Sequence, residues 1–393
     1  MSAHRAATLL VTLTALATPP DRARAQLARE ELLRIERPRV VADAQRYLAE
    51  APQTITSFPA ARSAGGPHDF YSEGDYWWPD PQNPNGPYVR RDGETNPDNF
   101  VAHRDAMRRL SRIVPALVAA YDITRDERYA RHAVDHLRAW FVSESTRMNP
   151  NLLYAQAIKG VSTGRGIGII DTIHLVEVAQ AIRVLERDGF LTGQPLGELK
   201  TWFAQYLEWM TTHPYGLDER RNGNNHSVAY ALQVAEFARL TGNDAQLAAM
   251  RTFFTDTIIP QQMASDGSFP RELARTKPYG YSLFQLDLVA MLAQVLSTPT
   301  VSLWTYTTAD GRSVRSAVSY MYPYIKDKRS WPRPPDVMYS DQWPVRQPAL
   351  LFAGLAFREP RYVDLWKTLD PAPQVDEIDR NFPIRQPLLW IEP

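Results

Sequence analysis

The sequence predicts an all-α protein assembled from helix hairpins. Three observations support this: apolar residues recur at helical spacing along most of the chain, two connections repeat one helix–turn–helix pattern, and strand-like alternation is scarce. Hydrophobic residues make up 44% of the 393 residues, which is enough for a substantial core and excludes a disordered chain.

The predicted helices follow one another along nearly the whole chain. In the clearest of them, Met107, Leu110 and Leu117 fall on one helical face. The full set of predicted helices is 27–48, 100–121, 127–142, 172–185, 196–211, 226–240, 245–258, 281–296, 313–322 and 348–357.

Two connections between predicted helices, residues 120–130 and 238–248, share one pattern. Each shows a helix end, a polar turn, and a second helix that begins with acidic residues near its positive end. Helix pairs joined in this way stack into bundles, toroids or solenoids.

Three segments fall outside the helical pattern. Residues 301–308, followed by Ala-Asp-Gly, alternate as a strand does and predict a short β-hairpin. Residues 58–99 and 330–347 are rich in proline and aromatic residues and have no periodicity. Loops of this length in a compact helical protein are usually functional, so we expect functional residues there.

The first residues have the order of a secretory leader. Two basic residues precede an apolar run at 6–17, and residues 23–25, Ala-Arg-Ala, supply a cleavage site. The apolar run is shorter than the roughly 20 residues that a membrane span needs.

We therefore expect residues 1–25 to be a signal peptide and residues 26–393 to form a single domain. The mature protein is expected to be periplasmic or secreted, with no membrane partner. A plain N-terminal helix is the alternative, and the Pro19-Pro20 pair argues against it because proline breaks helices.

The composition excludes several functional classes. The absence of cysteine excludes disulfides, thiolate metal sites and a cysteine nucleophile. The formal net charge is +0, so the basic excess expected of a nucleic-acid-binding protein is missing. A polyanion would have to be bound by Arg and Lys residues that are clustered locally. The 10 Trp and 18 Tyr provide flat amphipathic rings that suit sugar stacking.

The most specific short segment is Asn-Gly-Asn-Asn-His-Ser at residues 222–227, directly before a predicted helix. Backbone N–H groups and the helix dipole favour an anion at such a position. The side chains of Asn224, Asn225 and His226 can also donate hydrogen bonds to a carboxylate. A turn that only caps the helix is the alternative interpretation.

A second polar segment, residues 266–282, leads into another predicted helix. A guanidinium group is a bidentate partner for a carboxylate, and a tyrosine can act as a general acid or base if nearby cations lower its pKa from about 10. A basic turn with two packing tyrosines is the alternative. The cations and tyrosines of this segment are Arg271, Arg275, Lys277, Tyr279 and Tyr281.

Together the two segments supply what β-elimination from a uronate requires. One group must neutralise the sugar carboxylate so that the C5 proton becomes acidic. A base must then remove this proton, and an acid must protonate the departing glycosidic oxygen. Asn, His, Arg and Tyr side chains fill these roles without a metal or other cofactor. His174 and Glu177 have the spacing of a metal pair, but no further ligand motif accompanies them.

Three parts of the chain together resemble a known family. They are Asn-Asn-His-Ser at 224–227, the spacing of Arg275 and Tyr281, and Gly-Asp-Tyr-Trp-Trp-Pro-Asp-Pro at 74–81. They are similar to the alginate lyase superfamily, and most of all to polysaccharide lyase family 38, which includes alginate and glucuronan lyases. The resemblance extends from residue 58 to residue 350. It implies an (α/α) toroid with a cleft across one end and an anionic polysaccharide as the substrate.

The resemblance also implies a role for each matching residue. Asn225 and His226 would neutralise the substrate carboxylate, with Arg275 assisting. Tyr281 would be the catalytic acid and, in a syn elimination, also the base. His226 is the alternative base in an anti elimination, because mannuronate and guluronate present the C5 proton on opposite faces.

Other residues are expected to bind the substrate, either by stacking on sugar rings or by contacting uronate groups. For any one of them, packing or solvent exposure is the alternative. Arg90, Arg91 and Asn96 are further candidates for lining a subsite. The expected substrate contacts are Tyr76, Trp77, Trp78, Gln156, Lys159, Arg165, Asn224, Arg271 and Tyr279.

Two other functions stay open on the sequence alone. A glycoside hydrolase on a similar toroid would need two carboxylates about 5–10 Å apart, and Asp75 and Asp171 are among the acids available. A non-catalytic glycan-binding protein would keep the aromatic and basic residues but would not need Tyr281 beside a cation. No motif here distinguishes mannuronate, guluronate and glucuronate polymers, endo from exo action, or one oligomeric state from another.

Overall fold

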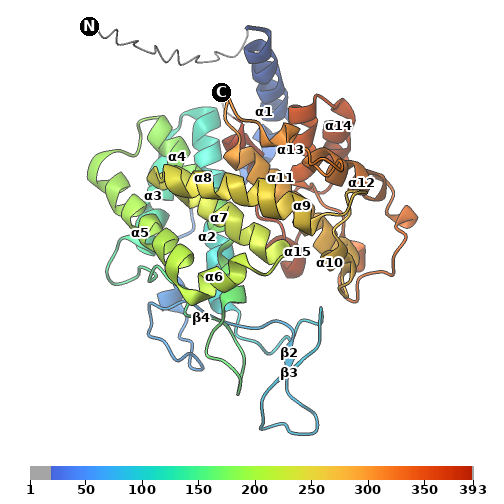
Figure 1. Cartoon of the computed structure of the whole chain (residues 1–393). Helices are drawn as coiled ribbons and strands as arrows, with labels where there is room; N and C mark the ends of the chain where they lie inside the picture. Colours follow the sequence, from blue (N-terminus) through green and yellow to red (C-terminus); the bar gives the residue numbers. More distant parts are fainter. Residues whose placement is uncertain (1–18, 392–393) are drawn as a thin grey trace, which may run out of the picture.

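Helices dominate the computed structural model, which describes residues 19–391 (Figure 1). The longer helices are α1 (Pro19–Tyr47), α2 (Ala102–Thr124), α3 (Glu127–Phe141), α4 (Leu175–Arg187), α5 (Gly193–Thr212), α7 (Asn225–Thr241), α8 (Asp244–Phe253), α11 (Pro278–Leu296), α12 (Val314–Lys326), α13 (Pro348–Phe357) and α14 (Pro360–Thr368). The shorter ones are α6 (Pro214–Arg220), α9 (Ile259–Gln262), α10 (Pro270–Leu273) and α15 (Asp376–Arg380).

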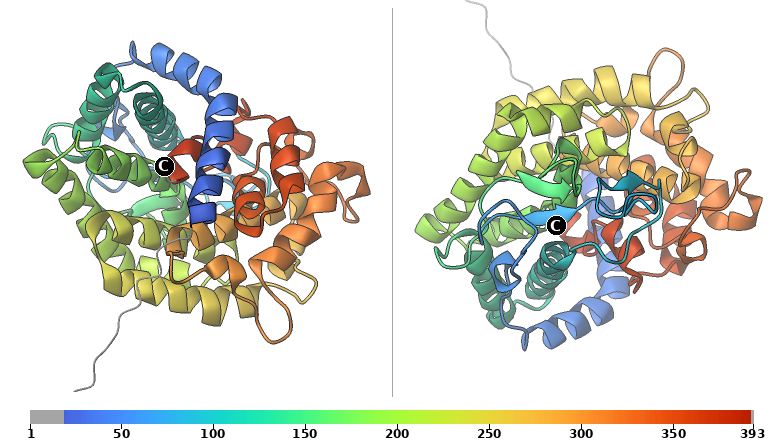
Figure 2. Two further views of the ribbon diagram at one scale, coloured as in Figure 1. Left: turned by 90° about the horizontal axis from the view of Figure 1, so that it is seen from above. Right: turned by 90° about the horizontal axis from the view of Figure 1, so that it is seen from below.

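The helices form an inner and an outer layer around a ring (Figure 2). The inner helices α2, α4, α7, α11 and α13 contact one another in that order. Four consecutive pairs, α2–α3, α7–α8, α11–α12 and α13–α14, are packed hairpins. Helix α1 packs against α2 and reaches α14 through the ion pair of Glu31 with Lys367. The all-α toroid of helix hairpins is confirmed.

The position of each helix follows from its apolar pattern. Helix α11 is buried on every side from Pro278 to Ala293, and such an all-round apolar helix belongs in the interior. Helix α3 instead buries one face, with Ala133, Leu137 and Trp140 inside and charged residues outside. One continuous apolar core joins the two layers.

The two predicted helix–turn–helix connections are present. Helix α2 is followed by Arg125 with φ 59°, and the Asp126 side chain accepts a hydrogen bond from the Arg128 backbone N–H to begin α3. Helix α7 ends at Gly242 with φ 73°, and Asn243 caps α8 in the same way.

Strands are few and short in the described residues, and most of them lie in the irregular stretch at 58–99. Strand β1 (Tyr71–Glu73) pairs in parallel with β4 (Tyr154–Ala157), and β2 (Trp77–Trp78) pairs antiparallel with β3 (Val89–Arg90). These segments lie across one end of the helical ring, below it in Figure 1.

The β-hairpin predicted at 301–311 is wrong. Residues Leu303–Thr305 form a 3₁₀ turn instead. The consecutive side chains of Leu303 and Trp304 are both buried, which an alternating strand does not allow. The Leu303 backbone N–H donates to Ser297 Oγ at 3.0 Å, so this turn is tied to the end of α11.

The predicted leader falls partly outside the described residues, which begin at residue 19. Helix α1 begins at the Pro19-Pro20 pair and runs past residue 25. Proline is tolerated in the first turn of a helix, so the pair starts this helix instead of breaking it. In the part of the chain from 19 to 391, no helix is both long enough and apolar enough to span a membrane.

Candidate active site

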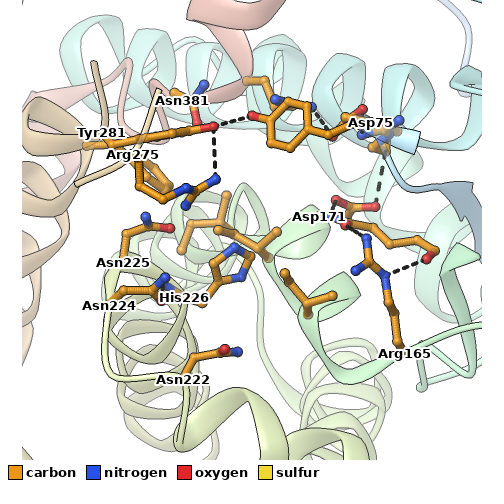
Figure 3. A pocket seen from close by; sticks show the side chains of 18 of the residues that line it. Asp75, Arg165, Asp171, Asn222, Asn224, Asn225, His226, Arg275, Tyr281 and Asn381 are labelled. Carbon is orange, nitrogen blue, oxygen red and sulfur yellow. Dashed lines mark hydrogen bonds and ion pairs between the residues drawn. The ribbon is translucent and has the colours of Figure 1, made fainter. Parts of the chain in front are cut away.

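A cavity of about 300 Å³ lies where the N-terminal parts of α2, α7 and α11 meet β2, β4 and α15 (Figure 3). Its size is at the small end of the range for ligand pockets, about 300–1,000 Å³. The polar side chains that line it are Asp75, Tyr76, Trp77, Arg90, Arg104, Arg108, Gln156, Arg165, Asp171, His174, Asn222, Asn224, Asn225, His226, Arg275, Tyr281, Arg380 and Asn381.

One wall is the turn that begins α7. The Asn224 side chain accepts a hydrogen bond from the His226 backbone N–H at 3.1 Å and so caps the helix. Gly223 has φ 70°, a left-handed conformation in which a residue with a side chain is strained, so this turn favours glycine. The His226 imidazole points into the cavity, with its Nδ1 2.8 Å from Glu219 Oε1 (Figure 3).

Asn225 lies on the same wall and is held by a second buried carboxylate. Glu272 accepts hydrogen bonds from the Asn225 backbone N–H at 2.8 Å and from its side-chain Nδ2 at 2.9 Å. Burial raises the pKa of Glu272, while these two hydrogen bonds and nearby Arg275 oppose that rise. The Asn225 amide is therefore fixed against the cavity.

Next to this wall, Tyr281 stands at the centre of a hydrogen-bonded group (Figure 3). Its hydroxyl lies 2.6 Å from the Tyr76 hydroxyl and accepts a hydrogen bond from Arg275 Nη2 at 3.3 Å. The Arg275 guanidinium also lies 4.4 Å from the centroid of the Tyr281 ring. Asp92 holds Arg275 in place through hydrogen bonds of 3.0 and 2.8 Å.

Burial raises the pKa of Tyr281 well above its usual value of 10.0, and the neighbouring Tyr76 adds to the rise. Arg275 lowers the pKa but does not offset the burial. The condition that nearby cations lower this pKa below its usual value is therefore not met in the structure. Near neutral pH the Tyr281 side chain is a neutral phenol that can donate a proton.

Opposite Tyr281, the cavity wall carries a buried ion-pair group. Asp75 accepts a hydrogen bond from Arg104 at 2.6 Å and forms a second ion pair with Arg380. Burial opposes ionisation of Asp75, but the two arginines outweigh it and lower its pKa to about 2. Arg104 comes from α2 and Arg380 from α15, so the pairs tie both helices to the start of β2.

Gln156 and Arg165 form the remaining wall. Arg165 donates from Nε and Nη2 to the backbone and side-chain oxygens of Gln156, at 2.9 and 3.0 Å. The Gln156 side chain in turn donates to Asp171 at 3.1 Å. Gln156 has φ 49°, an uncommon backbone conformation for a residue other than glycine. The Arg165 guanidinium also lies 5.7 Å from the Trp77 ring centroid, so its plane is fixed from several sides.

The structure brings most of the predicted site residues together in one cavity. Those lining it are the predicted catalytic group, Asn225, His226, Arg275 and Tyr281, and the predicted binding residues Tyr76, Trp77, Gln156, Arg165 and Asn224. Of the three further subsite candidates, Arg90 also lines it.

Four predicted binding residues do not line the cavity. Arg271 donates to the Asn222 carbonyl at 2.6 Å, Lys159 lies over the Tyr88 ring, and Trp78 donates to the Glu94 carbonyl. None of these three side chains is part of the cavity lining.

The prediction that Tyr279 binds substrate is wrong. This side chain is 0% exposed, and its hydroxyl donates to the Tyr324 carbonyl at 3.0 Å. An α-helix turns by about 100° per residue, so side chains two positions apart point to nearly opposite sides. Tyr279 therefore enters the core, whereas Tyr281 faces the cavity.

The sequence interpretation missed several residues of the cavity and its surroundings. The residues that it missed are Arg104, Arg108, Glu219, Glu272, Arg380 and Asn381. Glu272 lies inside the polar segment 266–282, but only the fold shows that it holds Asn225. The others come from segments far away in sequence or from short helices without a motif, where no local signal points to them.

His174 lines the cavity, but Glu177 is turned away from it. Both Glu177 oxygens accept from the Arg385 backbone, and one also accepts from that of Gln386. Across residues 19–391 no three His, Cys, Asp or Glu side chains gather as metal ligands would.

Comparisons with known proteins identify the family and the fold. A family model described as alginate lyase matches residues 54–331. An alginate lyase from Bacteroides ovatus, known from a crystal structure, is 31% identical, with a TM-score of 0.79 over 95% of this chain and 97% of its own. No curated protein sequence matches the chain.

Alginate lyase A1-III from a Sphingomonas species shares the fold at lower identity. Its crystal structure is 15% identical, with a TM-score of 0.55 over 90% of this chain and 95% of its own. A variant of A1-III in complex with a tetrasaccharide gives a TM-score of 0.58 at the same identity, over 96% of this chain and 99% of its own.

Proposed function

The chain belongs to the alginate lyase family, and from this premise we propose that it cleaves alginate by β-elimination in the cavity beside Tyr281. It is a polysaccharide lyase. The observation that carries the proposal is the convergence of Asn225, His226, Arg275 and Tyr281 on one cavity, from segments up to 56 residues apart in the numbering.

The chemistry begins at the sugar carboxylate. An amide N–H from Asn225, the His226 imidazole and the Arg275 guanidinium can each donate a hydrogen bond to it. Their combined effect is to stabilise the negative charge that develops on the carboxylate when the C5 proton leaves. Because Asn225 is buried and the His226 and Arg275 side chains are only 14% and 20% exposed, these hydrogen bonds are stronger than they would be on the surface.

Elimination then breaks two bonds and forms one double bond. The C5–H bond breaks and its proton goes to the base, while its electron pair becomes the C4–C5 double bond. The C4–O bond breaks, and the departing glycosidic oxygen takes a proton from Tyr281. A neutral phenol, as burial makes Tyr281, is in the right state to give that proton.

Two residues are candidates for the base. In a syn elimination Tyr281 takes the C5 proton and returns it to the glycosidic oxygen, which requires the phenol to ionise once the substrate is bound. In an anti elimination His226 takes the proton from the opposite face and Tyr281 serves only as the acid. Mannuronate and glucuronate bonds fit the first route and guluronate bonds fit the second.

The cavity offers little support for hydrolysis. Its two lining carboxylates, Asp75 and Asp171, are both committed to other residues. Asp75 is held between two arginines, and Asp171 accepts hydrogen bonds from Ser72 and Gln156. A hydrolase needs one of its carboxyl groups protonated, whereas the pKa of Asp75 is lowered to about 2.

The test is to incubate the purified protein separately with polymannuronate, polyguluronate and glucuronan. Ultraviolet absorbance of the unsaturated product should rise with at least one alginate polymer, because β-elimination creates a conjugated double bond and hydrolysis does not. A rise with glucuronan alone would replace alginate as the proposed substrate. New reducing ends without absorbance would contradict the lyase reaction.

A further inference from the structure

Behind the wall of the cavity lies a glutamate that the proposed reaction does not use directly. Glu219, on the short helix α6, is 0% exposed. One carboxylate oxygen lies 2.8 Å from His226 Nδ1, and the other accepts a hydrogen bond from Asn222 Nδ2 at 2.6 Å. Both partners line the cavity, so one buried carboxylate holds two of its polar side chains.

The chain fixes Glu219 itself by packing α6 tightly. Helix α6 begins at Pro214, where the His213 side chain accepts from the Tyr215 backbone N–H. A Cβ on Gly216 would lie 1.7 Å from the Met210 carbonyl oxygen, so α6 sits directly against the end of α5. The carboxylate therefore has little freedom to move.

A buried carboxylate is costly unless a cation accompanies it. In the described chain, no Lys or Arg lies within 4.0 Å of Glu219, and its one ion-pair partner is His226. Glu236, equally buried on α7, instead pairs with Arg239 at 3.1 Å, well away from the cavity lining. A glutamate that depends on a histidine for its partner indicates a role tied to that histidine.

The hydrogen bond decides what His226 presents to the substrate. An ionised carboxylate can only accept, so Nδ1 carries a proton and Nε2 is the nitrogen left for the cavity. As a neutral ring, His226 then shows a lone pair on Nε2. As an imidazolium paired with Glu219, it shows an N–H donor for the substrate carboxylate.

We propose that Glu219 is a positioning residue of the lyase, which holds His226 in the Nδ1–H form with Nε2 toward the substrate and orients the Asn222 amide beside it. This inference rests on the proposed function, because it takes His226 to face the uronate carboxylate. Glu219 acts through these two side chains and does not touch the substrate.

The first measurement is the tautomer of His226 in the unaltered protein. Nitrogen-15 NMR of histidine-labelled protein, with the His226 signal assigned by its loss in His226→Ala, should show a protonated Nδ1. A neutral His226 with its proton on Nε2 would overturn the proposal without any change to Glu219.

The second measurement is a double-mutant cycle. Glu219→Gln should lower kcat by about 10- to 100-fold, the range known for carboxylates that orient metal-bound histidines. In the His226→Ala background the same change should add at most a few-fold, because its effect passes mainly through His226. Glu236→Gln, a matched change of a buried glutamate outside the cavity, should leave kcat unchanged.

Three results separate the possible outcomes. Equal losses from Glu219→Gln in both backgrounds, or no loss in either, would overturn the positioning role. If Glu219→Gln does not fold, the tautomer of the unaltered protein still decides. If the unaltered protein shows no lyase activity on any of the three polymers, the proposed function is overturned instead.

Discussion

At the scale of single residues, Tyr281 combines two features that rarely occur together: deep burial and contact with a cavity. Burial keeps its phenol neutral, and Arg275 and Tyr76 fix the direction of its hydroxyl. A positioned acid of this kind contributes about 10²- to 10⁴-fold to a reaction rate. We expect Tyr281→Phe to lower kcat by that amount with KM little changed, measured from the ultraviolet absorbance of the product.

The chain contains a matched control for this change. Tyr279 is two residues away on the same helix and is also buried, but its hydroxyl bonds the Tyr324 carbonyl and not the cavity group. Tyr279→Phe should lower the thermal unfolding midpoint slightly and leave kcat intact. Equal activity of the two variants would remove Tyr281 from the reaction. If the unaltered protein also showed no turnover, a glycan-binding protein would be favoured.

The site residues that the sequence predicted are those that sit in recognisable polar segments. Asn225 and His226 begin one helix, and Arg275 and Tyr281 lie at the start of another. Local pattern and chemistry marked these two segments, and the resemblance to the alginate lyase superfamily then assigned the four residues their roles. Arg380 and Glu219 could not be selected, because their role depends on a fold that brings distant segments together. Tyr279 was assigned wrongly because a sequence segment does not show which side of the helix faces the cavity.

At the scale of elements, the C-terminal segment around α15 completes the cavity. It carries Arg380 and Asn381 into the lining, beyond the residues matched by the family model. It is held partly by Glu177 of α4, which accepts hydrogen bonds from the backbone N–H groups of Arg385 and Gln386. Burial raises the pKa of Glu177 to about 7, although these hydrogen bonds oppose the rise.

This raised pKa makes stability depend on pH in a defined window. Between the unfolded value of 4.5 and the folded value of about 7, the folded protein binds a proton on Glu177 that the unfolded chain does not. The free energy of unfolding should therefore fall as pH rises through this window, by up to about 3 kcal/mol from this group. The window is separate from that of Asp75, whose stabilisation is lost only as pH falls from 3.8 through about 2.

Urea unfolding at several pH values within this window checks the prediction. The unaltered protein should lose stability relative to Glu177→Gln as pH rises, since glutamine does not titrate. Parallel curves for the two proteins would show that Glu177 does not titrate in this range.

The helices were predicted better than their connections. The ten predicted helices all correspond to helices of the structure, because each has either an amphipathic face or a long apolar run. Helices α6, α9, α10, α14 and α15 were missed, because each has nine residues or fewer and is too short for periodicity to appear. The pairing of β1 with β4 joins residues 71 and 154, and no local pattern could indicate so distant a contact.

At the scale of the whole molecule, the N-terminal segment predicts export. If residues 1–25 are a leader, the protein recovered from outside the cytoplasm should begin at Gln26. Mass spectrometry of the secreted or periplasmic protein measures this directly. A mature protein that retains the first residues would show that the segment is not cleaved.

The distribution of charge leads to a second prediction at this scale. The formal net charge is +0, yet six arginines and two aspartates line the cavity. Acids such as Asp92 and Glu377 stand behind the arginines and hold them, so the positive charge faces inward. A polyanion is therefore attracted at the cavity and not by the molecule as a whole.

Such local attraction should weaken as salt is added. The screening length falls from about 10 Å at 0.1 M to about 3 Å at 1 M, so kcat/KM for a short oligouronate should drop by about tenfold or more over that range. Most of the loss should appear in KM, because the groups around Tyr281 are too close together to be screened. Arg165→Met should lower kcat/KM at low salt and flatten its dependence on salt. If kcat/KM stays constant while the protein remains folded, the cavity charges do not guide the substrate, and shape and hydrogen bonding alone would then have to account for recognition.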